Sequence, residues 1–204
     1  MKLYYLRGAC SIVPHTALQW IGKPYQAEAA THETIKSPEY LRLNPQGAVP
    51  VLIDGDFVLT QNVAILSYLD QLNPQAKIFG SNEPQAHARA MRWLSFCNSD
   101  LHPLFGPLFH PEGLAGDNPE FIKEIQKNAT AKILNLLAKA NEHLANQPYL
   151  GDSLSVADVY LYVELRWCKG MKVDFSALEH LEAFYQRVEA NQGVQEVLKQ
   201  QGLK

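Results

Sequence analysis

A lone cysteine near the N-terminus is the first residue of this sequence whose position suggests chemistry. Cys10 follows a strand-like run at residues 2–6 and a break at 7–9, and a helix is expected from Ser11. The thiol therefore lies beside the positive end of a helix dipole, where a thiol loses its proton most readily. The ordinary alternative is a buried, inert cysteine. Because Val13 stands where a Cys-x-x-Cys pair needs its second thiol, any redox chemistry would be mixed-disulfide formation with an outside thiol.

Two further segments could bind a peptide-like ligand. Val49-Pro50 precedes an expected strand, and a cis bond there would turn the N–H and C=O of Val49 outward, where they could pair with an extended peptide. An ordinary trans turn is the alternative. Thr60-Gln61-Asn62 opens a second helix, whose free N–H groups either bind a carboxylate or are simply capped. Together with Cys10, these features suit a short peptide that carries a thiol and a carboxylate.

A third group lies in the helix expected over residues 93–102. At helical spacing Ser95, Ser99 and His102 share one face, and Asp100 lies on an adjoining stripe. A lone histidine is more often structural than functional, so His102 needs support from elsewhere. The seven histidines show no metal-ligand spacing, and we expect no metal site.

The elements that must position these residues divide the chain in two. Over residues 1–76 the patterns follow the order βαβ, a short irregular helix and ββα, which predicts a small mixed sheet. After a turn-rich stretch, residues 84–204 are helical throughout. There Ser155 and Asp158 fit a capping box, and residues 156–167 are apolar almost all round, which predicts a central helix. A further apolar stripe predicts a long helix: Phe121, Ile125, Ala129, Ile133, Leu136, Ala140 and Leu144.

Composition limits the classes of function. The 204 residues are 47% hydrophobic and carry a formal net charge of −3 without a cluster of Lys or Arg, so we expect no nucleic-acid partner. No run approaches the roughly 18–20 apolar residues of a spanning helix, and no signal peptide is evident. We therefore expect no membrane association and a cytoplasmic location. Three widely spaced cysteines fit neither a disulfide framework nor a zinc site.

Several motifs, in this order and spacing, resemble those of one family. They are Met1–Tyr5, Gly8–Ser11, Asn44–Pro50, Leu59–Ile65, Asp100–His102, Pro107–Phe109, Ser155–Asp158, Leu165–Trp167 and the C-terminal Gln201–Lys204. On these residues the chain is similar, over essentially its whole length, to bacterial cytosolic glutathione S-transferases of the beta class. The resemblance implies an α/β thioredoxin-like, glutathione-binding domain over residues 1–76. It also implies a separate all-α domain over residues 84–204, a homodimer, and glutathione as co-substrate without a further cofactor.

The resemblance also implies roles for single residues. Pro50 would be cis, and Val49 would pair with the cysteinyl part of glutathione. Gln61 and Asn62 would hold the γ-glutamyl end, and Cys10 would lie beside the glutathione sulfur. The expected glutathione-binding residues are Ala9, Cys10, Lys36, Val49, Pro50, Gln61, Asn62, Ser95, Ser99, Asp100 and His102, of which Cys10 and His102 would be catalytic.

The helical half would complete the site. His102 would line the cleft, and Asp100 would reach the ligand of a neighbouring subunit. The family commonly has Glu where this chain has Gln61, and its usual helical Asn and its usual Lys would correspond to Ser95 and Pro103. The electrophile would bind near Phe105, Phe109, Leu114 and Trp167.

Two functions follow as hypotheses. The first is a transferase that joins the glutathione thiolate to small hydrophobic electrophiles, with thiol-transferase or peroxidase activity through Cys10 as a variant. The second, motivated by Gln61, Asn62, Ser95 and Pro103, is a non-enzymatic protein of the same fold that binds a ligand or regulates a partner.

Overall fold

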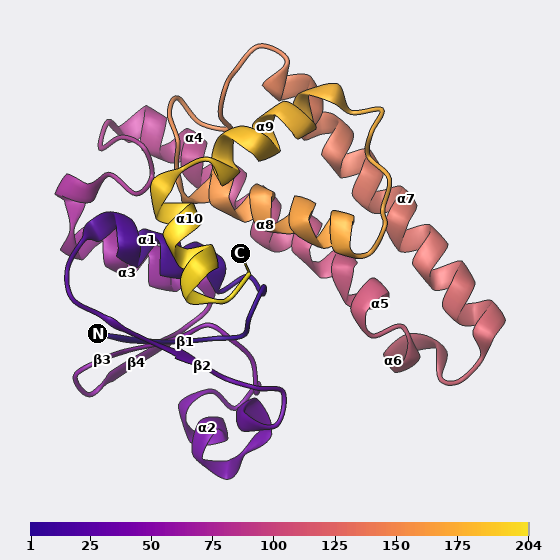
Figure 1. The fold of residues 1–204 in the computed structure, drawn as a ribbon, viewed down its shortest axis with the longest axis horizontal. Coiled ribbons are helices and arrows are strands. Elements are labelled where there is room, and N and C mark those ends of the chain that lie inside the picture. The colour runs from indigo at the N-terminus through magenta and orange to yellow at the C-terminus, as the bar shows by residue number, and fades with distance from the viewer. Residues whose placement is uncertain (204) are drawn as a thin grey trace.

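The first part of the chain folds into a four-stranded sheet with helices on both faces (Figure 1), and the computed structural model describes residues 1–203. Its elements are β1 (Lys2–Tyr5), α1 (Ile12–Ile21), β2 (Gln26–Ala29), a 3₁₀ turn (Thr34–Lys36), α2 (Pro38–Leu43), β3 (Val51–Asp54), β4 (Phe57–Thr60) and α3 (Asn62–Leu72). The strand order is β2-β1-β3-β4, with β1 and β2 parallel and the other pairs antiparallel. The predicted βαβ unit with an added hairpin is confirmed.

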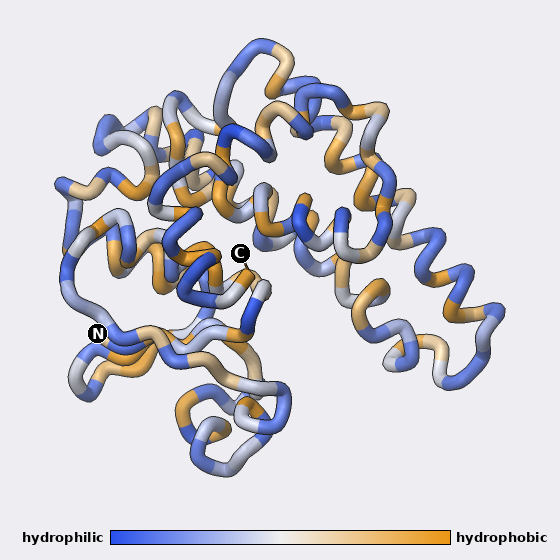
Figure 2. The backbone as a smooth tube through the Cα atoms, viewed as in Figure 1, coloured by the Kyte–Doolittle hydropathy of each residue, from blue (hydrophilic) through white to orange (hydrophobic). Residues whose placement is uncertain are grey.

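The two faces of this sheet bury different residues because side chains alternate along a strand. Leu3 of β1 pairs with Leu52 of β3, and both are buried in the main core with α1 and α3. Val51 and Tyr4 belong instead to a smaller cluster with Tyr40 of α2. Hydrophobic residues accordingly gather where the sheet meets α1 and α3 (Figure 2).

The rest of the described chain is helical. After a 3₁₀ turn (Pro74–Ala76) come α4 (Pro84–Ser95), a π-helical turn (Phe96–Leu101), a 3₁₀ turn (His102–Phe105), α5 (Gly106–Phe109), α6 (Glu112–Ala115), α7 (Pro119–Leu144), α8 (Val156–Gly170), α9 (Glu179–Glu189) and α10 (Gln192–Gln200). The predicted fold class, an α/β part followed by an all-α part, is confirmed. Within residues 1–203 no helix combines the length and apolar character needed to cross a membrane. Lys204, the end of the second predicted domain, lies outside the described residues.

Helix α8 joins the two parts of the chain. Its first ten residues, 156–165, are all buried, so every face of this part of the helix is covered, and α8 packs against both α1 and α4. The predicted capping box is present, with the Asp158 carboxylate accepting hydrogen bonds from the N–H of Leu150 at 2.7 Å and of Ser155 at 2.8 Å. Burial raises the pKa of Asp158 to about 6. The prediction of a central helix is confirmed.

Helix α7 departs from its predicted stripe at two positions. Phe121 is 58% exposed, and Leu137 rather than Leu136 is fully buried. The N-terminal half of α7 extends away from the other long helices (Figure 1), so an apolar residue there has little to pack against. Amphipathic spacing predicted the helix correctly, but how far the neighbouring helices reach decides which of its residues are buried.

Candidate functional site

A hollow of about 300 Å³ between the sheet and the helical part brings together most of the predicted polar residues. We name it the thiol hollow. Its lining residues are Cys10, Asn44, Gln46, Ala48, Val49, Pro50, Gln61, Asn62, Asn98, His102, Pro103 and Tyr160. One wall comes from the turns before β3 and α3, and the other from the π-helical region and α8.

Backbone groups dominate the sheet-side wall. The carbonyl of Ala48 accepts hydrogen bonds from Asn44 Nδ2 at 2.7 Å and from the Tyr40 hydroxyl at 2.9 Å. These two bonds hold the turn that leads into Val49-Pro50, whose peptide bond is cis, as the resemblance predicted. The turn thus presents Val49 and Pro50 to the hollow.

Helix α3 begins at this wall one residue later than predicted. Gln61 has φ +73°, so it precedes the helix and Asn62 is the first helical residue. The Gln61 amide donates to Gln46 Oε1 at 3.1 Å within the thiol hollow. The Asn62 side chain turns inward, is only 4% exposed, and donates from Nδ2 to the Tyr160 hydroxyl at 3.3 Å.

Cys10 also lines the thiol hollow, and its side chain is a protonated thiol. Its Sγ is 3.9 Å from the carbonyl oxygen of Val49, to which the thiol donates. Burial raises the pKa of Cys10 to about 11, although the Asn62 side chain and the backbone at the start of α1 act in the opposite direction. The expectation of a readily ionised thiol is therefore wrong for the ligand-free protein, because removal from water outweighs the helix dipole. Ser11 does not cap α1 through its side chain, which donates instead to Leu6 O at 3.3 Å.

Side chains make the helical wall. His102 Nδ1 lies 2.6 Å from the Tyr160 hydroxyl, which also contacts Asn98 Oδ1 at 3.1 Å. Burial lowers the pKa of His102 and raises that of Tyr160. At neutral pH both groups are therefore uncharged, and His102 can take up a proton.

Sequence reasoning missed Asn98 and Tyr160 and chose other residues from the same segment. Ser95, Ser99 and Asp100 are exposed and line neither this hollow nor the one described next. The predicted common face of Ser95, Ser99 and His102 is wrong because residues 96–101 form a wide π-helical turn, which rotates later residues relative to an α-helix. The polar side chain of Asn98, four residues before His102, is the sequence feature that could have indicated which face of this segment lines the hollow. A contact from Asp100 to a neighbouring subunit stays a prediction.

A second hollow of about 830 Å³ adjoins the first and shares Cys10, Ala48, Val49 and His102 with it. We name it the aromatic hollow. Phe109 and Trp167 line it, with ring centroids 5.5 Å apart, and Ala9 and Lys36 lie on its other side. Trp167 is held in place because its Nε1 donates to Gly8 O at 2.8 Å.

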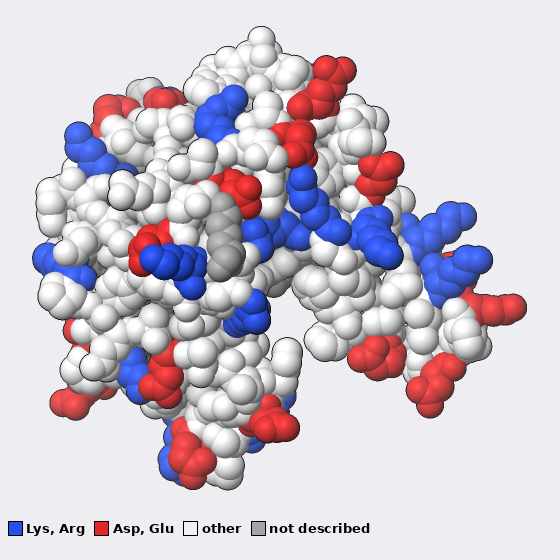
Figure 3. Space-filling view, in the orientation of Figure 1, with Lys and Arg blue, Asp and Glu red and all other residues white. Residues whose placement is uncertain are grey.

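Of the four residues predicted to lie near the electrophile, two line the aromatic hollow and two do not. Phe109 and Trp167 reach the aromatic hollow, whereas Phe105 is fully buried behind them and stacks on Phe109 at 6.0 Å. Leu114 is 69% exposed and lines neither hollow, so its prediction is wrong. It lies on the short helix α6, of which no residue is buried. Figure 3 shows the recess between the region of α2 and that of α5 and α6.

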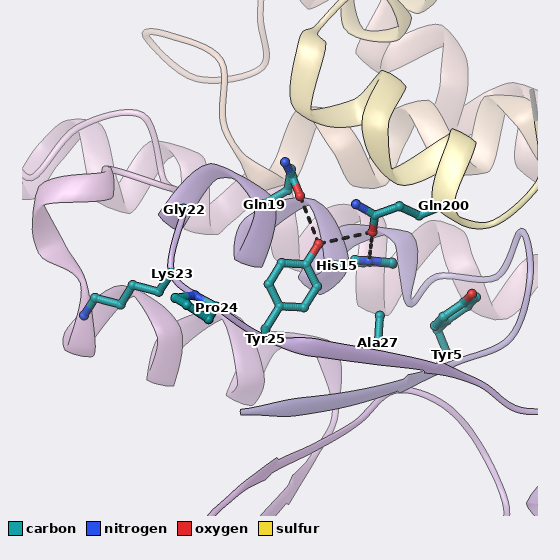
Figure 4. Close-up of a pocket in the computed structure, with 9 residues that line it drawn as sticks. All are labelled: Tyr5, His15, Gln19, Gly22, Lys23, Pro24, Tyr25, Ala27 and Gln200. Carbon is teal, nitrogen blue, oxygen red and sulfur yellow. Dashed lines mark hydrogen bonds between the residues drawn. The ribbon is translucent and has the colours of Figure 1, made fainter.

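A third hollow, between α1, β2 and α10, is a structural feature (Figure 4). His15 is fully buried there, with its ring beside those of Tyr5 and Tyr25 and its Nε2 2.9 Å from Gln200 Oε1. Burial lowers the pKa of His15 to about 4. These polar side chains bond to one another and thereby join α10 to α1. Among residues 1–203 no cluster of His, Cys, Asp and Glu could hold a metal ion.

Comparison with known proteins gives concordant similarities. The model described as "Glutathione S-transferase, N-terminal domain" matches residues 1–71, and "Glutathione S-transferase, C-terminal domain" matches residues 96–192. Glutathione S-transferase GST-4.5 of Xanthomonas campestris pv. campestris is 40% identical over 204 residues, which cover 100% of each chain. A glutathione-S-transferase structure from Xylella fastidiosa is 43% identical, with a TM-score of 0.93 and 98% of each chain covered. A bacterial beta class glutathione S-transferase from Sphingomonas chungbukensis is 33% identical, with a TM-score of 0.87 and 100% of each chain covered.

Proposed function

Because this chain belongs to the glutathione S-transferase family, we propose that it joins the thiolate of glutathione to small hydrophobic electrophiles. The observation that carries this proposal is the meeting of the thiol hollow and the aromatic hollow at Cys10 and His102. A thiol ligand on the sheet-side wall would face the space between Phe109 and Trp167. That space is large enough for an aromatic electrophile.

Glutathione would bind along the sheet-side wall. The N–H and C=O of Val49 would pair with its cysteinyl part like an added strand, because the cis bond to Pro50 faces the hollow. Gln61 and the first N–H groups of α3, including that of Asn62, would receive its γ-glutamyl end. Lys36, whose Nζ is 3.4 Å from Gly47 O, would supply a cation at the other end. Ala9, beside Cys10, would contact the middle of the ligand.

His102 and Cys10 would act on the glutathione sulfur. A neutral His102 accepts the thiol proton, and the S–H electron pair stays on sulfur. The thiolate attacks the electrophilic carbon, and a leaving group such as halide departs with its bonding pair. Lowering the pKa of the glutathione thiol by about 2 units corresponds to about 2.7 kcal/mol of preference for the thiolate. Cys10, as a neutral thiol, would donate a hydrogen bond to that thiolate.

A redox reaction through Cys10 is the variant of this proposal. Its thiol lies next to the expected docking edge at Val49. As a thiolate it would attack one sulfur of glutathione disulfide, so that the S–S bond breaks, one glutathione stays joined to Cys10 and the other leaves as a thiolate. Because burial raises the pKa of Cys10 to about 11, this exchange needs a bound ligand that restores its ionisation.

The first experiment is calorimetric titration with glutathione, followed by a conjugation assay with a halodinitrobenzene. We expect binding and thioether formation in the wild type. Cys10→Ala should retain conjugation within about tenfold but lose glutathione-dependent reduction of a mixed disulfide. Absence of glutathione binding at millimolar concentration would favour the non-enzymatic alternative.

The same proposal includes the organisation of the protein. We place the glutathione-binding domain at residues 1–76 and the helical, electrophile-binding domain at residues 84–204. The family models, which match residues 1–71 and 96–192, support this division. We further propose a cytoplasmic homodimer with a role in detoxification, in which the exposed Asp100 reaches the partner's ligand and Ser95 and Ser99 belong to the same glutathione-binding segment. Light scattering of the purified protein tests the dimer, because a monomer would contradict it.

A further inference from the structure

The hydroxyl of Tyr160 connects three side chains at the thiol hollow. Asn62 Nδ2 donates to it from α3 at 3.3 Å, and Asn98 Oδ1 accepts from it at 3.1 Å. His102 Nδ1 lies 2.6 Å away. The network thus spans the sheet-side wall and the helical wall, and Tyr160 is at its centre.

The number of protons in this network determines the tautomer of His102. A tyrosine hydroxyl donates one hydrogen bond and accepts two. Its proton goes to Asn98 Oδ1 and one lone pair takes the N–H of Asn62, so the remaining lone pair faces His102. With the two amides in these orientations the hydroxyl has only a lone pair left for His102, so His102 carries its proton on Nδ1 and donates it to Tyr160. In the other tautomer the hydroxyl would donate to Nδ1, and Asn98 Oδ1 would face an oxygen without a proton between them, so their 3.1 Å hydrogen bond would be lost.

We propose that Tyr160 is a positioning residue that holds His102 in the Nδ1–H tautomer, so that Nε2 presents a lone pair to the bound thiol. This inference rests on the proposed function, since it assigns how the base of that reaction is prepared. When the thiol proton moves to Nε2, the S–H electron pair stays on sulfur. The imidazolium keeps its Nδ1–H bond to Tyr160, and the proton on Nε2 then passes to water.

The surroundings of His102 support this assignment. Among the described residues Nε2 has no hydrogen-bond partner, and His102 lines both hollows beside Cys10. The Trp167 ring packs against the imidazole with centroids 4.9 Å apart and planes at 68°, which limits rotation of the ring. A fixed ring with a single tautomer is what a general base requires, because the lone pair must already point at the proton.

The direct test is ¹⁵N NMR of the ligand-free protein with labelled histidine, in which protonated and unprotonated ring nitrogens give distinct signals. His102→Asn identifies the His102 resonances by their loss. In the wild type we expect a protonated Nδ1 and an unprotonated Nε2. Tyr160→Phe removes only the hydroxyl, so it should leave a mixture of tautomers. Tyr162→Phe is the matched control, because Tyr162 is a buried neighbour on α8 whose hydroxyl bonds to Glu189.

Asn98→Leu gives the sharpest comparison. It removes the acceptor of the Tyr160 proton while keeping both Tyr160 and His102, so that proton should turn to His102 Nδ1. We therefore expect the opposite tautomer, with the proton on Nε2. This variant also keeps the proposal testable if Tyr160→Phe fails to fold.

Kinetics supply the second measurement. In Tyr160→Phe we expect kcat for conjugation to fall about tenfold, as part of the general-base contribution is lost, with KM for glutathione changed less than about twofold. Tyr162→Phe should retain wild-type kcat. A protonated Nε2 in the wild type, or an unchanged tautomer in both Tyr160→Phe and Asn98→Leu, would overturn the proposal. Correct tautomers without conjugation in the wild type would instead contradict the proposed function and leave the role of Tyr160 standing.

Discussion

The two walls of the thiol hollow are built in different ways. The sheet-side wall offers mainly backbone groups, presented by the cis turn at Val49-Pro50 and by the start of α3. The helical wall offers side chains, those of Asn98, His102 and Tyr160, from the π-helical turn, the 3₁₀ turn after it and α8. Backbone N–H and C=O groups pair with the backbone of a peptide, so they bind it but do not take up its protons. A network of side chains that includes a histidine can move a proton. The difference indicates that changes in the sheet-side wall alter binding and that changes in the helical wall alter the rate.

The largest expected effect comes from the helical wall. His102→Ala should lower kcat for conjugation about 100-fold, the usual contribution of a general base, while glutathione affinity changes less than about threefold. Stopped-flow or steady-state kinetics with calorimetry would separate the two. His180→Ala, an exposed histidine of α9, is the control. A large loss of glutathione affinity with unchanged kcat would contradict this comparison, because it would mean that the helical wall serves binding.

A buried amide tests the sheet-side wall. Asn44→Ala removes the 2.7 Å bond to Ala48 O, so we expect about 1–3 kcal/mol of lost stability and about tenfold weaker glutathione binding. The near-complete burial of Asn44 explains the size of the effect. Asn73→Ala is a matched control, since Asn73 is also buried and donates to Leu69 O at 2.9 Å, away from both hollows. Denaturation and calorimetry on both variants should give similar stability losses but different affinities.

The core behind the helical wall contains a buried acid whose effect depends on pH. Glu164 of α8 is fully buried, and neither carboxylate oxygen has a hydrogen-bond partner among residues 1–203. Burial raises the pKa of Glu164 well above the usual value of 4.5, although the nearby Cys97 thiol acts in the opposite direction. The folded state therefore holds a proton that the unfolded state releases. Stability from this group is fully present below about pH 4.5 and falls by about 1.4 kcal/mol per pH unit up to the folded pKa.

Glu164→Gln should remove that dependence, because the amide resembles the protonated acid and does not ionise. We expect the free energy of unfolding of the variant, measured by urea denaturation between pH 5 and pH 8, to fall less steeply with pH than that of the wild type. Glu142→Gln on the exposed face of α7 is the control. Equal slopes for Glu164→Gln and the wild type would show that Glu164 already ionises in the folded protein.

The smallest expected effect returns to the sheet-side wall. Gln61→Glu would place a carboxylate near the glutathione ammonium, and an exposed ion pair of this kind should tighten binding about threefold at low salt. The gain should shrink as ionic strength rises, because salt screens exposed charges. Calorimetry at two salt concentrations measures both. A gain in kcat instead of affinity would mean that this wall also takes part in the chemistry.

The sheet-side wall was accessible to sequence reasoning because its motifs are contiguous. Val49, Pro50, Gln61 and Cys10 each lie at a turn that neighbouring residues define, and the structure brings all four to one hollow. For Cys10, however, the sequence predicted a lowered pKa, whereas burial raises it. The helix dipole is a local feature, but the burial that outweighs it comes from the packing of distant parts of the chain around Cys10.

Sequence patterns alone were enough to predict the order of elements, the capping box at Ser155–Asp158 and the central apolar helix, because these depend on local spacing and on which residues must leave water. The contact of His102 with Tyr160, and through it with Asn98 rather than Ser95 or Ser99, depends on long-range packing. A π-helical turn changes the angular position of every residue that follows it, and a residue 58 positions away completes the network. Neither fact is contained in the periodicity of a single helix.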